Sequence, residues 1–392
     1  MSFLRAARAA LAGHNCFPRI LVALAIVLAG LSTSCSNGGQ HIQVPNHNAY
    51  VTLPADGSVL LLYIDGESGA ITQGPKTPST LGTTPTGLAL LPSRQFLYAI
   101  NSFANTISIF NVNASDGTLA LTGTPTQAGF GPSSAVIDPS GKYLLVTNNF
   151  GNNVSVFAID SGSGALSEVQ GSPFFANDNP TEILITPNGQ FVFVTNPGIG
   201  MVTAFKFSSG VLTPVPGTPV FSGSGAGALA IDSSERFLYV ANSAASNPPP
   251  NALTIGNVSG FNIDPTTGAL TPILGSPFTS TVGNANGPTA IAVDPGGNFV
   301  YAVTSGSSDS VWCFQITPTN GQLVAVTSSP FSVTAGGLYA LFDPSGGRLY
   351  IGSQSSPGIA GYRYNPSTGT PTAISGSPFS TGVAPGQMVF SE

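Results

Sequence analysis

The chain has 392 residues, of which only 7% are charged, while 48 are glycine and 33 are proline. This composition argues against a helical or disordered chain and favours a sheet protein with many tight turns. Acidic residues outnumber basic ones by 16 to 10, which argues against a nucleic-acid partner.

Residues 1–35 have the pattern of an export signal. Arg5, Arg8 and Arg19 precede an apolar run over residues 20–31, and small residues follow up to Cys35. The run is too short to cross a bilayer core as a helix. Residues 31–35 resemble a bacterial lipobox, with the leucine one position further from the cysteine than usual. We therefore expect a bacterial, extracytoplasmic protein, either lipid-anchored at the cell envelope through Cys35 or secreted.

Residues 36–49 are predicted to be a tail, and the repeated part of the chain begins near residue 50. Beyond the signal only Cys35 and Cys313 remain, so the chain has no disulfide framework. Membrane contact is expected only through the lipid anchor.

A repeated unit fills the rest of the chain. Each copy opens with an apolar stretch after a proline, turns at a segment such as 138–141 (Asp-Pro-Ser-Gly), and continues into an aromatic-rich strand that ends near Asn. Successive copies start 46–49 residues apart, except for one spacing of 62; the starting residues are Pro85, Pro132, Pro180, Ala226, Pro288, Gly337 and Pro385. Such a period predicts a repeat architecture.

Each unit contains four short strand candidates, as in one blade of a β-propeller. The strands are nearly continuous apolar runs, which indicates that both faces of each sheet are covered. Val156 and Phe157, for example, point to opposite faces, yet both are expected to be buried.

The seventh copy is divided between the two ends of the chain. Its first strand follows Pro385, and its other strands begin near Tyr50. Pairing these segments would close the array into a ring without an open edge. The sequence therefore predicts an all-β, seven-bladed β-propeller of four antiparallel strands per blade over residues 50–392.

The unit that begins at Ala226 is longer than the others because of the segment Ser243–Asn257, which contains Pro248, Pro249 and Pro250. Long loops often carry binding residues. This loop should lie on the same face as Phe130 and Asp178. That face is a candidate recognition surface; the alternative is a neutral insertion.

The strands Tyr143–Asn148 and Phe193–Asn196, with a Gly-x-Leu element after the third strand, resemble the lactonase family of seven-bladed propellers. The resemblance covers residues 50–392. It implies either an activity such as that of 6-phosphogluconolactonases and carboxymuconate-cyclising enzymes, or a surface propeller of the Tyr-Val-Thr-Asn repeat type, many of which have no known activity.

The resemblance also implies a Gly-Pro-Arg-His segment and an Asn-Glu pair in the enzymes of the family. Here the corresponding segments are Gly131–Ser134 and Asn148-Asn149, so Ser133, Ser134 and Asn149 replace the Arg, His and Glu that the resemblance implies. The usual groups for activating water and stabilising an oxyanion are therefore replaced by neutral ones.

Glu182 is the one unusual carboxylate, because the matching positions of other copies hold Gly87, Ser134 and Ala290. It is predicted on an innermost strand, facing the central channel, where it is a candidate base; the alternative is a solvated side chain. Asp178 is the nearest possible partner. Two carboxylates fall short of the ligand set that calcium prefers, so we expect no metal site and no cofactor.

Two functions remain open. The first is a monomeric binding or scaffold module at the cell envelope, whose partner is a small molecule, a glycan or an envelope protein. The second is a lactone hydrolase, a carboxylic ester hydrolase, or a cycloisomerase that uses Glu182.

Overall fold

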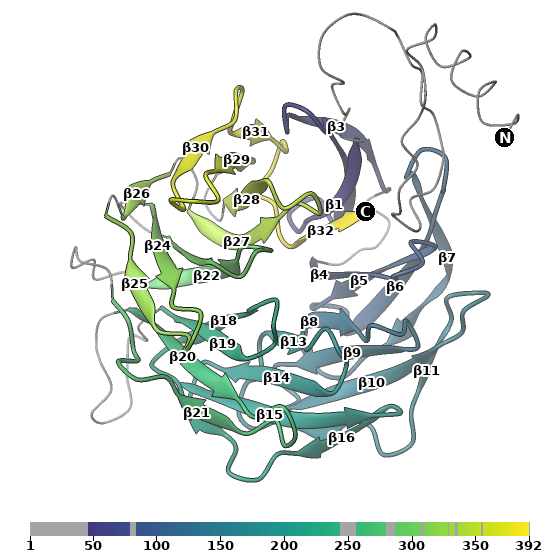
Figure 1. Cartoon of the computed structure of the whole chain (residues 1–392). Helices are drawn as coiled ribbons and strands as arrows, with labels where there is room; N and C mark the ends of the chain where they lie inside the picture. The colour runs from purple at the N-terminus through teal and green to yellow at the C-terminus, as the bar shows by residue number, and fades with distance from the viewer. Residues whose placement is uncertain are drawn as a thin grey trace, which may run out of the picture. The chain divides into compact units, whose positions relative to one another are not determined.

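The computed structural model describes residues 46–78, 84–243, 256–279, 287–305, 309–327, 329–333, 336–353 and 356–391. Every regular element among them is a β-strand. The strands form seven antiparallel sheets that stand as blades around a common centre (Figure 1). The predicted seven-bladed propeller is therefore confirmed. None of the described residues forms a helix with the length and hydropathy required to cross a membrane.

The closing blade combines the two ends of the chain, as predicted. From the centre outwards it contains β32 (Met388–Ser391), β1 (His47–Leu53), β2 (Ser58–Ile64) and β3 (Ile71–Lys76). In Figure 1 the yellow C-terminal strand lies beside the purple β1. Met388 pairs with Val51, and Ser391 pairs with Asn48.

The other six blades follow in chain order, each with its first strand at the centre. The second and third blades comprise β4 (Pro85–Leu90), β5 (Phe96–Asn101), β6 (Thr106–Val112) and β7 (Leu119–Gln127), then β8 (Pro132–Ile137), β9 (Tyr143–Asn148), β10 (Asn153–Ile159) and β11 (Leu166–Glu168). The fourth and fifth comprise β13 (Ile183–Ile185), β14 (Phe191–Asn196), β15 (Met201–Ser208) and β16 (Val211–Pro214), then β18 (Ala226–Ile231), β19 (Phe237–Asn242), β20 (Asn257–Ile263) and β21 (Leu270–Pro272). The sixth and seventh comprise β22 (Pro288–Val293), β23 (Phe299–Thr304), β24 (Ser310–Ile316) and β25 (Leu323–Ala325), then β27 (Gly337–Phe342), β28 (Arg348–Ser353), β29 (Gly358–Tyr364) and β30 (Pro371–Ala373).

Four blades also contain a two-residue strand that the sequence did not predict. Each pairs with the third strand of its blade, beside the short outermost strand. These additional strands are β12 (Phe174–Phe175), β17 (Val220–Phe221), β26 (Phe331–Ser332) and β31 (Phe379–Ser380). Three of them begin at the phenylalanine of a Ser-Pro-Phe segment, whose ring packs against a core cluster.

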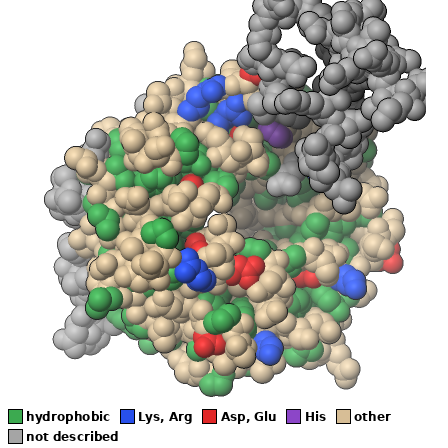
Figure 2. All heavy atoms as spheres, viewed as in Figure 1, with side chains coloured by type: hydrophobic (Ala, Val, Ile, Leu, Met, Phe, Trp, Pro, Cys, Tyr) green, Lys and Arg blue, Asp and Glu red, His purple; other side chains and the backbone are tan. Residues whose placement is uncertain are grey.

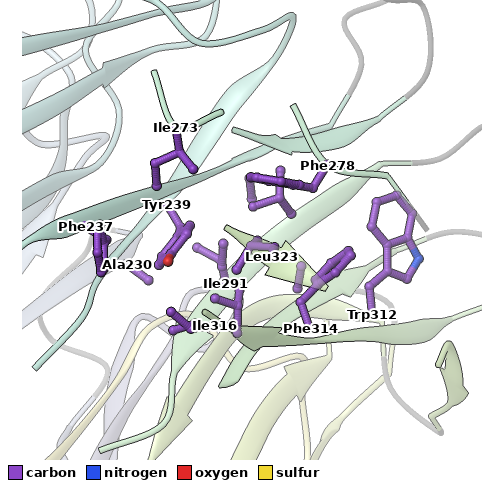
Figure 3. Close-up of a cluster of buried hydrophobic side chains, with 14 residues drawn as sticks. Ala230, Phe237, Tyr239, Ile273, Phe278, Ile291, Trp312, Phe314, Ile316 and Leu323 are labelled. Atoms are coloured by element: carbon purple, nitrogen blue, oxygen red, sulfur yellow. The ribbon is translucent and has the colours of Figure 1, made fainter. Parts of the chain in front are cut away.

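The hydrophobic core lies between neighbouring blades. Val156 packs toward the fourth blade and Phe157 toward the second, and both are almost fully buried, as expected. Figure 3 shows one such cluster, which contains Phe237 and Tyr239 of the fifth blade and Trp312 and Phe314 of the sixth. Neighbouring blades are therefore held together by apolar packing between their strands.

A recurring tyrosine of the second strand adds a polar link between blades. Its hydroxyl donates to the carbonyl of a turn glycine in the next blade, and in every case the tyrosine is fully buried. The five pairs are Tyr50–Gly117, Tyr98–Gly164, Tyr239–Gly321, Tyr301–Gly369 and Tyr350–Gly69. The last pair joins the seventh blade to the closing blade.

Two faces of the ring can be defined from the connections. The loop face carries the segments that lead into the innermost strands and those that join second to third strands. The turn face carries the turns between first and second strands and between third and fourth strands. On the turn face, the Asp138 carboxylate accepts the amide hydrogens of Lys142 and Tyr143 at 2.8 and 2.6 Å, which confirms its predicted role in the turn.

Candidate functional site

Glu182 lies at the inner edge of the fourth blade, directly before β13 rather than within it. Its amide donates to Thr195 Oγ1 at 3.1 Å, and its carbonyl accepts the Thr195 amide at 3.1 Å. Thr195 Oγ1 in turn donates to the carbonyl of Gly227 in the next blade at 3.1 Å. The backbone of Glu182 is thus fixed by its own blade, which is tied to its neighbour.

The carboxyl group of Glu182 is in an unusual environment. Its side chain keeps partial contact with solvent, yet protein atoms surround it closely. Desolvation raises its pKa from 4.5 to about 7, and no hydrogen bond or ion pair within the described part of the chain offsets this effect. The group is therefore divided between its acid and base forms near neutral pH.

Ser134 holds the same repeat position in the preceding blade. Its amide donates to Thr147 Oγ1 at 3.1 Å, and Thr147 Oγ1 also lies 3.1 Å from the carbonyl of Thr181, next to Glu182. The Ser134 hydroxyl is buried without a hydrogen-bond partner among the described residues. Buried hydroxyl groups without a partner are uncommon in folded proteins, so this one is a candidate for a specific role.

The hydroxyl of Thr86 on β4 is also buried without a hydrogen-bond partner among the described residues. This residue was not among the predicted site residues. Its position in the repeat could have identified it from the sequence, because the residue after the opening proline is Ser or Thr in four copies: Thr86, Ser133, Thr181 and Thr289. In most innermost strands the pairing register shifts at this point, as at a β-bulge. Bulges redirect side chains and occur beside functional sites.

Asn149 lies on the loop face between the third and fourth blades. Its side-chain amide donates to the carbonyl of Pro180 at 3.2 Å, and its backbone amide donates to the carbonyl of Gly131 at 2.8 Å. The structure therefore connects Asn149, Ser134 and the segment before Glu182 through two adjacent blades.

Asp178 is exposed on the loop that leads to Glu182. The two residues beside it, Asn177 and Asn179, have φ angles of 63° and 48°. Asparagine tolerates this region better than most residues. Asn196 Nδ2 donates to the Asp178 carbonyl at 2.9 Å, so the backbone of the loop is held against the blade.

The remaining predicted site residues lie outside the described residues. They are Cys35, Pro248, Pro249 and Pro250. The strands on either side of the long segment are described. Asn242, the last residue of β19, pairs with Asn257, the first residue of β20, at the loop face.

Figure 2 shows a hollow at the centre of the ring, with several acidic and basic side chains beside it on the face in view. The seven innermost strands contain no lysine, arginine or histidine. No group of three metal-ligating side chains occurs within the described ranges. The inner edges of the third and fourth blades thus hold one carboxyl group with a raised pKa and one buried hydroxyl group without a partner among the described residues. A carboxyl group with a pKa near 7 is suited to proton transfer.

The ring of seven antiparallel blades defines the protein as a seven-bladed β-propeller. The chain matches the family described as "Lactonase, 7-bladed beta-propeller" over residues 28–183 and 177–384, and it belongs to this family. No curated protein matches the sequence.

Solved structures share the fold at low identity. A putative 6-phosphogluconolactonase from Bacteroides uniformis is 20% identical, with a TM-score of 0.73 over 88% of this chain and 99% of that one. A second putative 6-phosphogluconolactonase, from Bacteroides fragilis, is 20% identical, with a TM-score of 0.74 over 91% of this chain and 100% of that one. The periplasmic gluconolactonase PpgL of Pseudomonas aeruginosa is 18% identical, with a TM-score of 0.66 over 89% and 99%. These similarities support the fold alone.

Proposed function

We propose that the protein hydrolyses a lactone at the centre of the ring, with Glu182 as the general base. The observation that carries this proposal is the pKa of about 7 for a carboxyl group without a partner in the described part of the chain. A base with a pKa near the working pH combines a useful fraction of the ionised form with good proton affinity.

In the proposed reaction, Glu182 accepts a proton from water as the water oxygen bonds to the lactone carbonyl carbon. The tetrahedral intermediate then collapses, the ring C–O bond breaks, and the departing oxygen takes the proton to give the hydroxy acid. The buried Ser134 hydroxyl is the candidate donor to the carbonyl oxygen, whose charge increases in the transition state.

The preferred substrate is an uncharged lactone of a sugar or of similar polarity. Phosphate recognition usually relies on arginine or lysine, and the innermost strands carry neither. The name of the Pseudomonas relative, a periplasmic gluconolactonase, agrees with such a substrate.

The test is hydrolysis of a lactone panel that includes glucono-δ-lactone, γ-butyrolactone and 6-phosphogluconolactone. Wild-type protein should hydrolyse an uncharged lactone, and Glu182→Gln should lower the rate by about 10²–10⁴-fold. Glu168→Gln is the matched control, because Glu168 is an exposed carboxylate on the outer strand β11. Absence of turnover in the wild type, or equal rates in wild type and Glu182→Gln, would contradict the proposal.

The second candidate is a binding or scaffold module without catalysis. It is favoured by Ser134 and Asn149, which stand where the family resemblance implies a His and a Glu. The partner would be a small molecule, a glycan or an envelope protein. Saturable binding of an intact lactone or glycan with no turnover would support this function.

Both candidates place the protein outside the cytoplasm, as a lipoprotein or a secreted monomer. The support is the pattern of residues 1–35, which ends at Cys35. Labelling of cells with a radioactive fatty acid should mark the protein and should fail to mark Cys35→Ala. Equal labelling of both would exclude this anchor.

A further inference from the structure

A cavity of about 510 Å³ opens on the turn face over the fifth blade, away from the site of Glu182. It is bounded by the turn Ser234–Phe237, by Asn188 of the fourth blade and by Thr319 of the sixth. Thr186, which also lines it, lies at the other end of β13 from Glu182. The volume lies in the usual range for small-ligand sites.

The turn that borders this cavity differs from its counterparts in the other blades. Glu235 has a φ angle of 57°, in the left-handed region that side chains disfavour. The equivalent position is glycine in four of the six described turns between first and second strands: Gly141, Gly189, Gly297 and Gly346. The remaining turn has Arg94, with a φ angle of 60°. A carboxylate thus occupies a position where glycine would be less strained, and such strain often marks a functional residue.

The neighbouring Arg236 is held in a fixed orientation. Its guanidinium carbon lies 4.6 Å from the centroid of the Phe237 ring. Nε donates to Ser234 Oγ at 2.9 Å, and Nη2 donates to the carbonyl of Pro318 at 2.8 Å. A guanidinium has five N–H donors, so three remain for a ligand. Preorganisation of this kind favours recognition of a carboxylate.

The Glu235 carboxylate is also held in position, but no cation neutralises its charge among the described residues. One of its carboxylate oxygens accepts the Asn188 amide from the fourth blade at 2.7 Å. Within the described part of the chain, neither Glu235 nor Arg236 forms an ion pair. The cavity therefore presents a carboxylate, which accepts hydrogen bonds, beside a guanidinium cation, and both groups can bind a ligand.

The charges and the size of the cavity restrict the ligand class. A multiply charged anion such as a phosphate ester would be repelled by Glu235, whereas hydroxyl groups can donate to it. The side chains of Asn188, Asn262 and Thr319 add neutral hydrogen-bonding groups to the wall. These features match a polyhydroxylated ring that carries a single carboxylate.

We propose that this cavity binds a saccharide unit with one carboxylate, of the uronic acid class. The carboxylate pairs with Arg236, and ring hydroxyl groups donate to Glu235 and bond to the side-chain amide groups of Asn188 and Asn262. This site is separate from the site of lactone hydrolysis, so either can exist without the other.

Calorimetric titration of the full chain with D-galacturonate, which carries one carboxylate, tests the proposal, with D-galactose as the uncharged comparison and diglycine as a zwitterion. The galacturonate should bind saturably, and the two comparison compounds should bind at least tenfold more weakly. Arg236→Met, which retains an apolar contact with Phe237, should weaken galacturonate binding by at least tenfold.

Glu235→Gly separates binding from folding, because the other turns accommodate glycine at this position. It should weaken galacturonate binding about fivefold or more, while the melting temperature stays unchanged or rises. Arg94→Gly, the matched control in the second blade, should leave the affinity unchanged. No saturable binding of galacturonate, tighter binding of diglycine, or unchanged affinity in Arg236→Met would overturn the proposal.

Discussion

The ionisation of Glu182 links the central site to the stability of the whole protein. The pKa of this group is about 7 in the folded state and 4.5 in the absence of the fold. Between these two pH values the folded protein retains a proton that the unfolded chain has lost. The contribution of Glu182 to stability is therefore most favourable below pH 4.5 and is lost as the pH rises through 7.

Substitution of Glu182 by glutamine should remove this dependence. We expect the wild-type melting temperature, relative to that of Glu182→Gln, to fall between pH 4.5 and 7. Thermal unfolding of the two proteins across this range measures the difference. A constant difference would show that desolvation does not raise the pKa of Glu182, and Glu168→Gln provides the control for a solvated carboxylate.

At the scale of elements, β32 closes the ring through its pairing with β1. It also contributes Met388, which is 1% exposed, to the cluster between the seventh and closing blades. Deletion of residues 388–392 would remove this packing and leave the edge of β1 without its hydrogen-bonded neighbour.

This deletion should lower the melting temperature by roughly 5–10 °C. Addition of a synthetic peptide of residues 388–391 should restore part of the loss, since the pairing of β32 requires no covalent link to the seventh blade. A melting temperature equal to that of the full chain would contradict the stabilising role of the closing strand.

The tyrosine links between blades form a second set of elements with a measurable effect. Tyr239→Phe removes the hydroxyl that donates to the Gly321 carbonyl at 2.8 Å and leaves that carbonyl without this partner. The free energy of unfolding should fall by about 1–2 kcal/mol. Tyr63→Phe is the control, because Tyr63 is only half-buried and no hydrogen bond of its hydroxyl occurs among the described residues. Equal stabilities of the two variants would show that the link contributes nothing.

At the scale of the whole molecule, the fold could be predicted because the repeat appears directly in the sequence. The spacing of the copies identifies the blades, and the division of the seventh copy identifies the closing pair, Met388–Ser391 with Asn48–Val51. The two-residue strands and the tyrosine links could not be predicted in this way. Their partners are set by the three-dimensional position of a third strand or of the next blade.

The candidate sites were predictable to different degrees. Glu182 emerged from comparison of the copies, but its pKa depends on how closely neighbouring blades surround it. Glu235 and Arg236 could be assigned only to a turn. Their role as the wall of a cavity depends on Asn188 and Thr319, which belong to two other blades.

The central claim is that Glu182 acts as a base in lactone hydrolysis, and the pH dependence of kcat/KM tests it most directly. After subtraction of spontaneous hydrolysis, kcat/KM for an uncharged lactone should rise with pH through an inflection near 7, where Glu182 loses its proton. In Glu182→Gln the residual rate should lack this inflection. An inflection that persists in Glu182→Gln, or a wild-type rate independent of pH between 5 and 8, would contradict the account.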